Sequence, residues 1–263
     1  MRYAFASEWI KLRRRRLLLG TYLALATVAA LGTVLTFATS GQVEGGPDPA
    51  ATTSIAALRS SKGITAGVES SIIFLGVVAF AIAAAQLASE YSLGTLRSLL
   101  VRQSRRQVLL AGKFLAVVTF MLSGAVVATG ASVATALVMA HVKGIPTAAW
   151  FTSSGLGSLG TGLGNIAIAV TGYVTLGMFL AVLLRAPVLT IVVGIAFILI
   201  VEQILAGIVT ETARWLPGQA LSAVAQGGTG GVGYGAALGV SAVYVLFALC
   251  TGTIVFCRRD VSA

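Results

Sequence analysis

The chain has 263 residues, an apolar fraction of 57% and a net charge of +10, but only 10% of its residues are charged. Soluble domains carry about 25% charged residues, so this chain has too few charges to cover a surface in contact with water. The positive charge does not indicate nucleic-acid binding, because the basic residues form short clusters between long uncharged stretches, as in membrane proteins with basic loops.

The first 16 residues predict an amphipathic helix lying on the membrane surface. The apolar side chains that share one broad sector at helical spacing are Tyr3, Phe5, Trp9, Ile10 and Leu12. The polar side chains of the opposite sector are Ser7, Glu8, Lys11, Arg14 and Arg15. A plain basic flank of the first span is the alternative interpretation, because Arg13 and Arg16 interrupt this pattern.

Six mostly apolar stretches with few charges are long enough for transmembrane helices, which need about 20 mostly apolar residues. The helices are expected near residues 17–39, 66–88, 108–139, 161–184, 187–208 and 235–257. Strands are disfavoured, because the apolar runs do not alternate and lipid admits only helices or closed barrels. The third stretch is long for one crossing, so its start, with Lys113, is expected in the cytoplasm. The predicted fold is an all-α polytopic membrane protein with one domain over residues 1–263.

The placement of Lys and Arg predicts that both chain termini are cytoplasmic. With the N-terminus inside, 14 basic residues lie on the cytoplasmic side and only Arg59, Lys62, Lys143 and Arg214 lie outside. This asymmetry follows the positive-inside rule. The outer segments 40–65, 144–160 and 209–234 are too short for a large receptor domain, and the last is either an extended or a re-entrant loop.

Residues 89–107 predict a cytoplasmic helix between the second and third spans. Leu93, Leu96 and Leu100 recur at helical spacing beside a strongly basic flank. Such a helix can insert its apolar stripe into a groove on a partner protein. A basic loop held against anionic lipid is the alternative, and composition leaves both interpretations open.

Glu202 is the carboxylate expected inside the membrane, about 26 Å along the fifth helix from Arg185 and therefore near the outer edge of the hydrocarbon core. It is a candidate for transport or gating, or alternatively an anchor for short outer helices. The other candidates for a substrate pathway are aromatic or polar positions on the second and fifth helices, namely Phe74, Phe80, Gln86, Phe197 and Gln203. Packing or lipid contact is the alternative role for these aromatic residues.

The sequence offers no catalytic or metal-binding arrangement. A P-loop requires Gly-x-x-x-x-Gly-Lys-Ser/Thr, whereas Gly112-Lys113 is followed by Phe114 and has Gln107 at the position of the first glycine. His141 lies nine residues after Ser132, on the opposite side of one helix, so no catalytic triad follows. We therefore expect any nucleotide site to lie on another polypeptide.

The order of several motifs resembles the ABC type-2 transporter permease family. The motifs that follow the second span are Glu90, Gly94-Thr95-Leu96-Arg97, Leu99-Leu100, Ser104-Arg105 and Gly112-Lys113. The opening Ser7-Glu8-Trp9-Ile10-Lys11-Leu12, followed by arginines, is also similar to the family's N-terminus. One departure is Arg102-Gln103, where many relatives have a proline before the Ser-Arg pair.

The resemblance implies the permease subunit of a bacterial exporter, a multi-pass homodimer of the plasma membrane surrounded by lipid. It implies that ATP and Mg²⁺ are bound by a separate cytoplasmic ATPase subunit, and that this chain is neither an enzyme nor a cofactor carrier. The residues implied to contact the ATPase through a coupling helix are Glu90, Gly94, Thr95, Leu96, Arg97, Leu100 and Arg105.

The apolar interior and short outer loops predict a hydrophobic or amphipathic cargo, such as a drug, a peptide antibiotic or a lipid. Two other functions stay open from the sequence. One is a non-transporting membrane partner, such as a sensor or an assembly factor. The other is a secondary transporter, which is disfavoured because Glu202 is the one expected intramembrane carboxylate and no repeat relates the two halves of the chain.

Overall fold

The computed structural model describes residues 2–40, 54–95, 105–209, 214–229 and 231–258. These residues are all-helical, and six of their helices are long and apolar enough to cross a membrane. The six are α2 (Arg15–Thr39), α5 (Ile72–Ser92), α7 (Arg106–Val142), α8 (Ser153–Leu184), the continuous unit α9–α10 (Pro187–Ile208) and α13 (Tyr234–Arg258). The predicted all-α class and the six spans are confirmed, and the chain is a multi-pass membrane protein.

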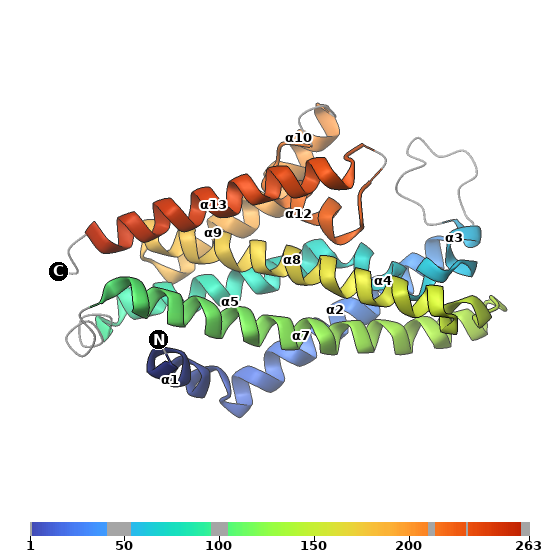
Figure 1. Ribbon diagram of the computed structural model, residues 1–263, viewed down its shortest axis with the longest axis horizontal. Helices are drawn as coiled ribbons and strands as arrows, with labels where there is room; N and C mark the ends of the chain where they lie inside the picture. The colour runs from blue at the N-terminus through green and yellow to red at the C-terminus, as the bar shows by residue number, and fades with distance from the viewer. Residues whose placement is uncertain (1, 41–53, 96–104, 210–213, 230, 259–263) are drawn as a thin grey trace.

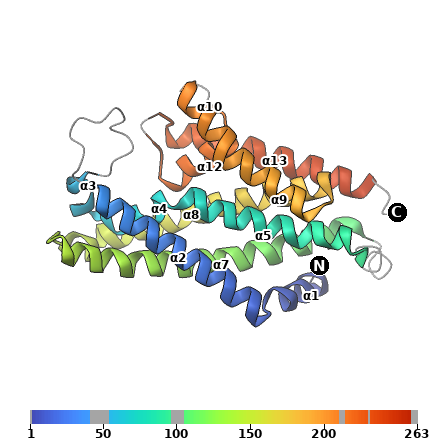
Figure 2. The same cartoon turned by 180° about the vertical axis from the view of Figure 1, so that it is seen from behind.

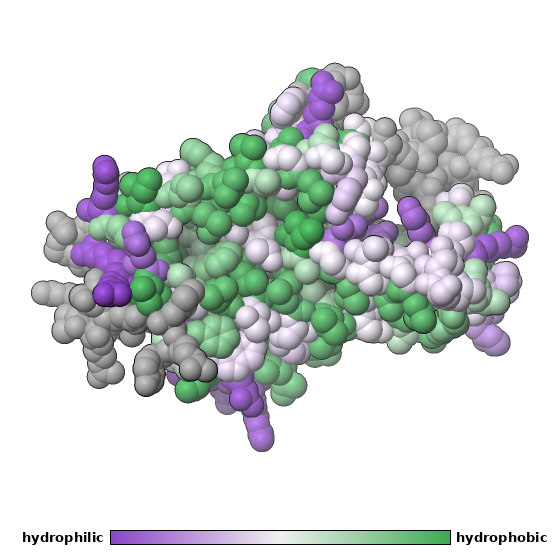
Figure 3. Space-filling view, viewed as in Figure 1, coloured by the Kyte–Doolittle hydropathy of each residue, from purple (hydrophilic) through white to green (hydrophobic). Residues whose placement is uncertain are grey.

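The long helices lie along one axis, with α5 and α8 at the centre of the bundle (Figure 1). Helices α2 and α7 pack on one side of this pair, and α9 and α13 pack on the other; Figure 2 shows the same order from behind. Helix α1 (Arg2–Leu12) and the last turn of α13 lie at the same end, which we call the α1 end. Hydrophobic residues cover the middle of the face in Figure 3, and hydrophilic residues gather towards the ends.

Two spans begin at different residues from those expected. The second begins at Ile72, because residues 66–70 form a separate short helix, α4 (Ala66–Ser70). The fourth begins at Ser153 rather than near 161, where the hydroxyl of Thr152 caps the helix by accepting the N–H of Gly155 at 3.3 Å. At about 1.5 Å per residue, α7 (37 residues) and α8 (32 residues) exceed the hydrocarbon core of about 30 Å, so both project beyond it.

A small second core closes the end of the bundle opposite α1. It is formed where α2, α7 and α8 meet three short elements, α3 (Ile55–Arg59), η1 (Ser61–Ile64) and η2 (Ala148–Phe151). Trp150 is fully buried there, stacks edge-on against Phe37 and donates its indole N–H to the Leu58 carbonyl at 2.9 Å. These contacts fix the far end of the helices.

The fifth span is continuous but irregular. Its parts are α9 (Pro187–Ala196), the π-helical turn η3 (Phe197–Val201) and α10 (Glu202–Ile208). The following segment, 209–234, contains α12 (Pro217–Ala225), which packs against α8 and α13. Ala220 and Val224 of α12 are fully buried, so this short helix is inserted among the spans.

Candidate functional site

Four charged side chains meet where α1, α5 and α7 converge at the α1 end. Lys113 Nζ of α7 lies 2.7 Å from Glu8 Oε1 of α1 and 2.6 Å from Glu90 Oε1 of α5. Lys11 Nζ of α1 lies 2.9 and 3.0 Å from the same two oxygens. We call these four residues the ion cluster. It links three helices through two carboxylates and two ammonium groups.

Three of the four side chains of the ion cluster are buried, Lys11 is partly exposed, and the charges balance. Lys113 is only 3% exposed, and Glu8 and Glu90 are also buried. Buried charges are costly unless they are paired and hydrogen-bonded, so each carboxylate depends on the two lysines. Within the cluster Glu90 Oε2 is buried without a hydrogen-bond partner, so all the pairing of Glu90 runs through Oε1.

The charges of α1 in the ion cluster are stabilised in their ionised forms. Burial raises the pKa of Glu8, but Lys113 and Lys11 outweigh burial and hold this pKa below its ordinary value. Burial lowers the pKa of Lys11, but its hydrogen bonds to Glu8 and Glu90 leave this pKa raised. Both groups therefore stay charged at neutral pH.

Helix α1 approaches α7 closely because Gly112 has no side chain. A Cβ at Gly112 would lie 2.6 Å from Ala4 Cβ and 3.2 Å from the Ala4 carbonyl carbon, well inside van der Waals contact. Ala4 and Leu12 of α1 are buried by this approach. Gly112 thus allows the close packing of α1 on α7, and Lys113 stabilises this packing through its ion pair with Glu8.

Two charged residues of this region are buried to a degree that the sequence did not predict. Glu8, assigned to the polar sector of α1, is buried against α7, whereas Ile10 of the apolar sector is 71% exposed. Lys113, expected at the cytoplasmic start of the third helix, lies near the start of α7, and its side chain is buried between helices. The physical reason is the same in both cases, since opposite charges on different helices neutralise one another and can be buried together.

The residues predicted for a coupling helix are only partly brought together. Glu90 belongs to the ion cluster, and Gly94 follows it with a positive φ of 66° that turns the chain at the end of α5. Thr95 is exposed, and so is Arg105, which precedes the first residue of α7. Leu96, Arg97 and Leu100 lie outside the described residues.

A polar cleft lies beside the ion cluster, with a volume of about 520 Å³. It is lined by α1, the start of α2 and the end of α5. The cleft brings together Glu90 and Thr95, predicted for partner contact, and Gln86, predicted for the substrate pathway. Lys11 and Arg14 line its other wall. Gln86 and Glu90 are four residues apart on α5, so the two predicted sets adjoin on one face of that helix.

Glu202 has a second, separate arrangement at the junction of α10 and α12. Its fully buried carboxylate accepts the backbone N–H of Gly218 at 3.0 Å and that of Gln219 at 3.1 Å. Tyr173 of α8 donates its hydroxyl to the Gly218 carbonyl at 3.0 Å. A carboxylate at a helix N-terminus satisfies unpaired amides and complements the helix dipole. The hydrogen bonds favour the anchoring role for Glu202.

The remaining substrate-pathway candidates separate into two groups. Phe80, Phe197 and Glu202 line a cavity of about 230 Å³ between α5, α8 and α9–α10. Phe80 is buried close to Gly194, where an added Cβ would lie 2.0 Å from the phenyl ring. Phe74 and Gln203 are exposed on the outside of the bundle and line none of these spaces.

Sequence reasoning missed three members of the ion cluster as site residues: Glu8, Lys11 and Lys113. The available signal was that all three belong to the motifs Ser7–Leu12 and Gly112-Lys113 that carry the family resemblance. The residues described by the structure contain no group of three or more His, Cys, Asp or Glu side chains that could hold a metal ion.

Six apolar helices, with a helix docked against them through a buried ion cluster, define an integral membrane protein of the multi-pass class. Residues 52–262 match the family described as protein of unknown function (DUF2705), and the chain belongs to this family. No curated protein matches the sequence.

Proposed function

We propose that this chain is the transmembrane permease subunit of an ATP-driven bacterial exporter, whose ATP and Mg²⁺ are bound by a separate cytoplasmic subunit. The observation that carries the proposal is the ion cluster. It joins the motif residues Glu8, Glu90 and Lys113 at the two helices that flank residues 89–107. A segment that receives force from a partner needs such a firm attachment to the spans it moves.

Helix contacts connect residues 89–107 to the interior of the bundle, where that force would act. Residues 89–107 connect the end of α5 to the start of α7, and Lys113 ties both helices to α1. A push on this segment therefore moves the ends of α5 and α7 together with α1. Helix α5 packs along α8 and α9, so its movement reaches the cavity lined by Phe80 and Phe197. Closure of an ATPase dimer would drive this movement by rigid-body displacement of packed helices.

The membrane arrangement and cargo follow from the same proposal. The α1 end is cytoplasmic, because its basic residues satisfy the positive-inside rule. Two copies form a homodimer, each bound to one ATPase subunit. The cavity near Phe80 is lined mainly by apolar side chains, which suits a hydrophobic or amphipathic cargo such as a drug, a peptide antibiotic or a lipid.

Co-purification with cytoplasmic proteins of the host tests the proposal. The informative variant is Gly94→Pro, because proline cannot adopt the φ of 66° and loses the N–H that Gly94 donates to the Tyr91 carbonyl at 3.2 Å. The matched control is Gly144→Pro at the opposite end, where φ is 65° and the N–H bonds the His141 carbonyl at 3.2 Å.

The proposal predicts that an ATPase subunit accompanies the wild type and Gly144→Pro but is lost from Gly94→Pro. If an ATPase accompanies all three equally, the 89–107 segment is not its attachment. If no ATPase accompanies the wild type in mild detergent, the function as an exporter subunit is wrong and a non-transporting membrane partner becomes the better account.

A further inference from the structure

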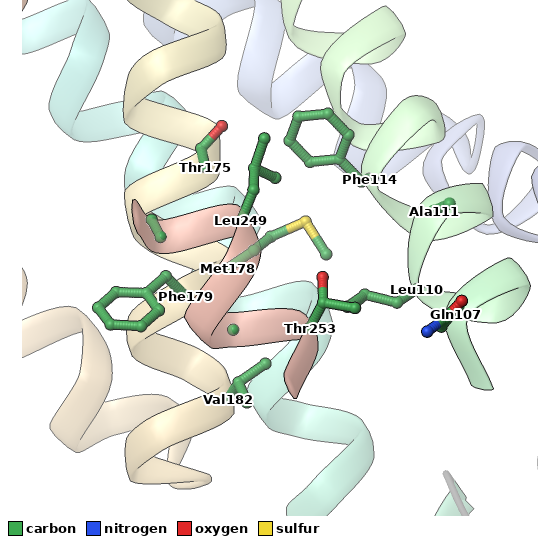
Figure 4. A pocket seen from close by; sticks show the side chains of 12 residues that line it. Gln107, Leu110, Ala111, Phe114, Thr175, Met178, Phe179, Val182, Leu249 and Thr253 are labelled. Carbon is green, nitrogen blue, oxygen red and sulfur yellow. The ribbon is translucent and has the colours of Figure 1, made fainter. Parts of the chain in front are cut away.

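A pocket of about 420 Å³ lies between α7, α8 and α13, towards the α1 end. It is separate from the ion cluster and from the cavity near Glu202, with which it shares only Phe179. Figure 4 shows Leu110 and Phe114 facing it from α7, Met178 from α8 and Leu249 from α13. Its volume falls in the usual range for ligand pockets, about 300–1,000 Å³.

The lining suits a hydrocarbon chain. Most of the lining side chains are aliphatic, aromatic or thioether groups, and the hydroxyl of Thr175 is already bonded to the Thr171 carbonyl at 2.8 Å. The pocket extends along α7 from Gln107 to Phe114, a rise of about 10 Å at about 1.5 Å per residue. This depth fits within one leaflet, since half of the hydrocarbon core is about 15 Å.

A basic residue, Arg106, adjoins the lining residue Gln107 at the α1 end of the pocket. Arg106 donates a guanidinium N–H to the Cys257 carbonyl at 3.2 Å, which joins the start of α7 to the end of α13. Arg105 and Arg258, which adjoin Arg106 and Cys257 in the sequence, are exposed. The polar residues Gln107 and Thr253 line the same end of the pocket. An apolar slot with a cationic rim matches a lipid that has an acyl chain and an anionic head group.

We propose that this pocket binds one acyl chain of an anionic phospholipid from the leaflet at the α1 end, with the phosphate beside Arg106. Charge complementarity favours this occupant over a second copy of the chain. A two-fold interface through this face would bring the arginines at the α1 end of one copy against those of the other. Arginines held near a membrane surface instead attract anionic head groups.

The test uses the full-length chain in lipid nanodiscs containing equal amounts of dioleoylphosphatidylglycerol and dioleoylphosphatidylcholine, with retained lipid measured by native mass spectrometry. Gly252→Leu fills the pocket from α13, where an added Cβ meets only ordinary contacts, the nearest at 3.4 Å from Phe179. Ala111→Leu fills it independently from α7. Gly239→Leu is the matched control, on the same helix with nothing within 4 Å of its added Cβ.

Arg106→Gln tests the head-group contact, and Arg59→Gln makes the same charge change at the opposite end of the molecule. We expect the wild type to retain phosphatidylglycerol in preference to phosphatidylcholine, and Arg106→Gln to lower that preference by about fivefold, the equivalent of one basic residue at a membrane surface. Gly252→Leu and Ala111→Leu should lose the retained lipid, whereas Gly239→Leu and Arg59→Gln should behave as the wild type.

Three results would overturn the proposal. The first is equal retention of both lipids by the wild type. The second is undiminished retention by either pocket-filling variant that still elutes as a folded protein. The third is a change in oligomeric state with Gly252→Leu and no change in lipid retention, which would assign the pocket to contact with a second copy.

Discussion

Lys113 and Glu90 form a buried ion pair with 2.6 Å between Nζ and Oε1, and this pair joins the two helices that bracket residues 89–107. The same lysine binds Glu8 of α1 at 2.7 Å. One side chain thus fixes the N-terminal helix, the second span and the third span relative to one another. The first three predictions concern this junction.

Replacing Lys113 with methionine should destabilise the protein strongly. The variant keeps most of the length of the side chain but leaves Glu8 and Glu90 buried together with only Lys11 to pair them. Removing one partner of a buried ion pair costs about 3–5 kcal/mol. Denaturant unfolding in detergent micelles measures the loss, with Lys62→Met at the opposite end as the control.

A combined variant separates the charge effect from packing. Glu8→Gln and Glu90→Gln together with Lys113→Met remove the buried carboxylates as well as the cation, so most of the stability should return. An equally unstable combined variant would show that Lys113 stabilises the junction by packing and not by charge.

Introducing a side chain at Gly112 should displace α1 from α7. The Cβ of Gly112→Val would lie 2.6 Å from Ala4 Cβ and press on the backbone of α1, and such overpacking costs about 1–3 kcal/mol. A reporter cysteine at Leu12, which is buried, should then react faster with a maleimide in a background lacking Cys250 and Cys257. Gly130→Val on the same helix meets nothing within 4 Å and should leave the rate unchanged.

Docking of α1 should be insensitive to pH across the neutral range. The pKa of Glu8 is lowered from its ordinary 4.5, so its contribution is present above pH 4.5 and is lost as the pH falls through the lowered pKa. The pKa of Lys11 is raised from 10.5, so its contribution is full below pH 10.5 and is lost as the pH rises through the raised pKa.

Spin labels at Ile10 and Leu115, both exposed, report the docking of α1 on α7. The distance between the labels should stay constant at every pH between the lowered pKa of Glu8 and the raised pKa of Lys11. It should increase only below the first or above the second. A transition near pH 6–7 would contradict the charge assignment of Glu8 and Lys11.

Glu202 should act as an anchor for α12. Glu202→Ala leaves the buried Gly218 N–H without its acceptor, and an unsatisfied buried group costs about 1–3 kcal/mol. Glu202→Gln keeps one acceptor oxygen, but its NH2 group would face a second backbone N–H that it cannot accept. Its loss of stability should therefore be intermediate. The thermal unfolding midpoint should be highest for the wild type, intermediate for Glu202→Gln and lowest for Glu202→Ala. Co-purification of the partner should be unchanged in both variants. Wild-type stability with lost transport would instead assign Glu202 to the substrate pathway.

The six spans could be predicted because lipid imposes a simple requirement, a helix of about 20 mostly apolar residues. The early start of α8 was missed because residues 153–160 are rich in Ser and Gly, which are weak helix formers. A cap from Thr152 and packing against the second core stabilise the helix there, and neither is visible in local composition. The separate helix α4 was missed because only Ser71 lies between it and α5; Glu69, close to this break, was the available signal.

The ion cluster could not be predicted, because three of its four ion pairs join residues that are 23 or more positions apart in the sequence. Helical periodicity placed Glu8 on a polar sector, which is as compatible with facing an oppositely charged helix as with facing water. The position of Glu202 near one end of the fifth span followed from counting residues, but its acceptor role depends on Gly218 and Gln219 in a later helix. Local patterns identified the residues, and only the tertiary structure identified their partners.

ATP hydrolysis by the purified assembly is the decisive test of whether this chain is the permease subunit of an ATP-driven exporter. The chain is isolated from host membranes in mild detergent, reconstituted into liposomes and assayed alone and with its co-purified cytoplasmic partner. We expect the chain alone to be inactive and the assembly to hydrolyse ATP. A hydrophobic or amphipathic compound should stimulate the rate with the wild type but not with Gly94→Pro. An assembly that hydrolyses no ATP, or a stimulated rate that is the same with the wild type and with Gly94→Pro, would contradict the proposed exporter function.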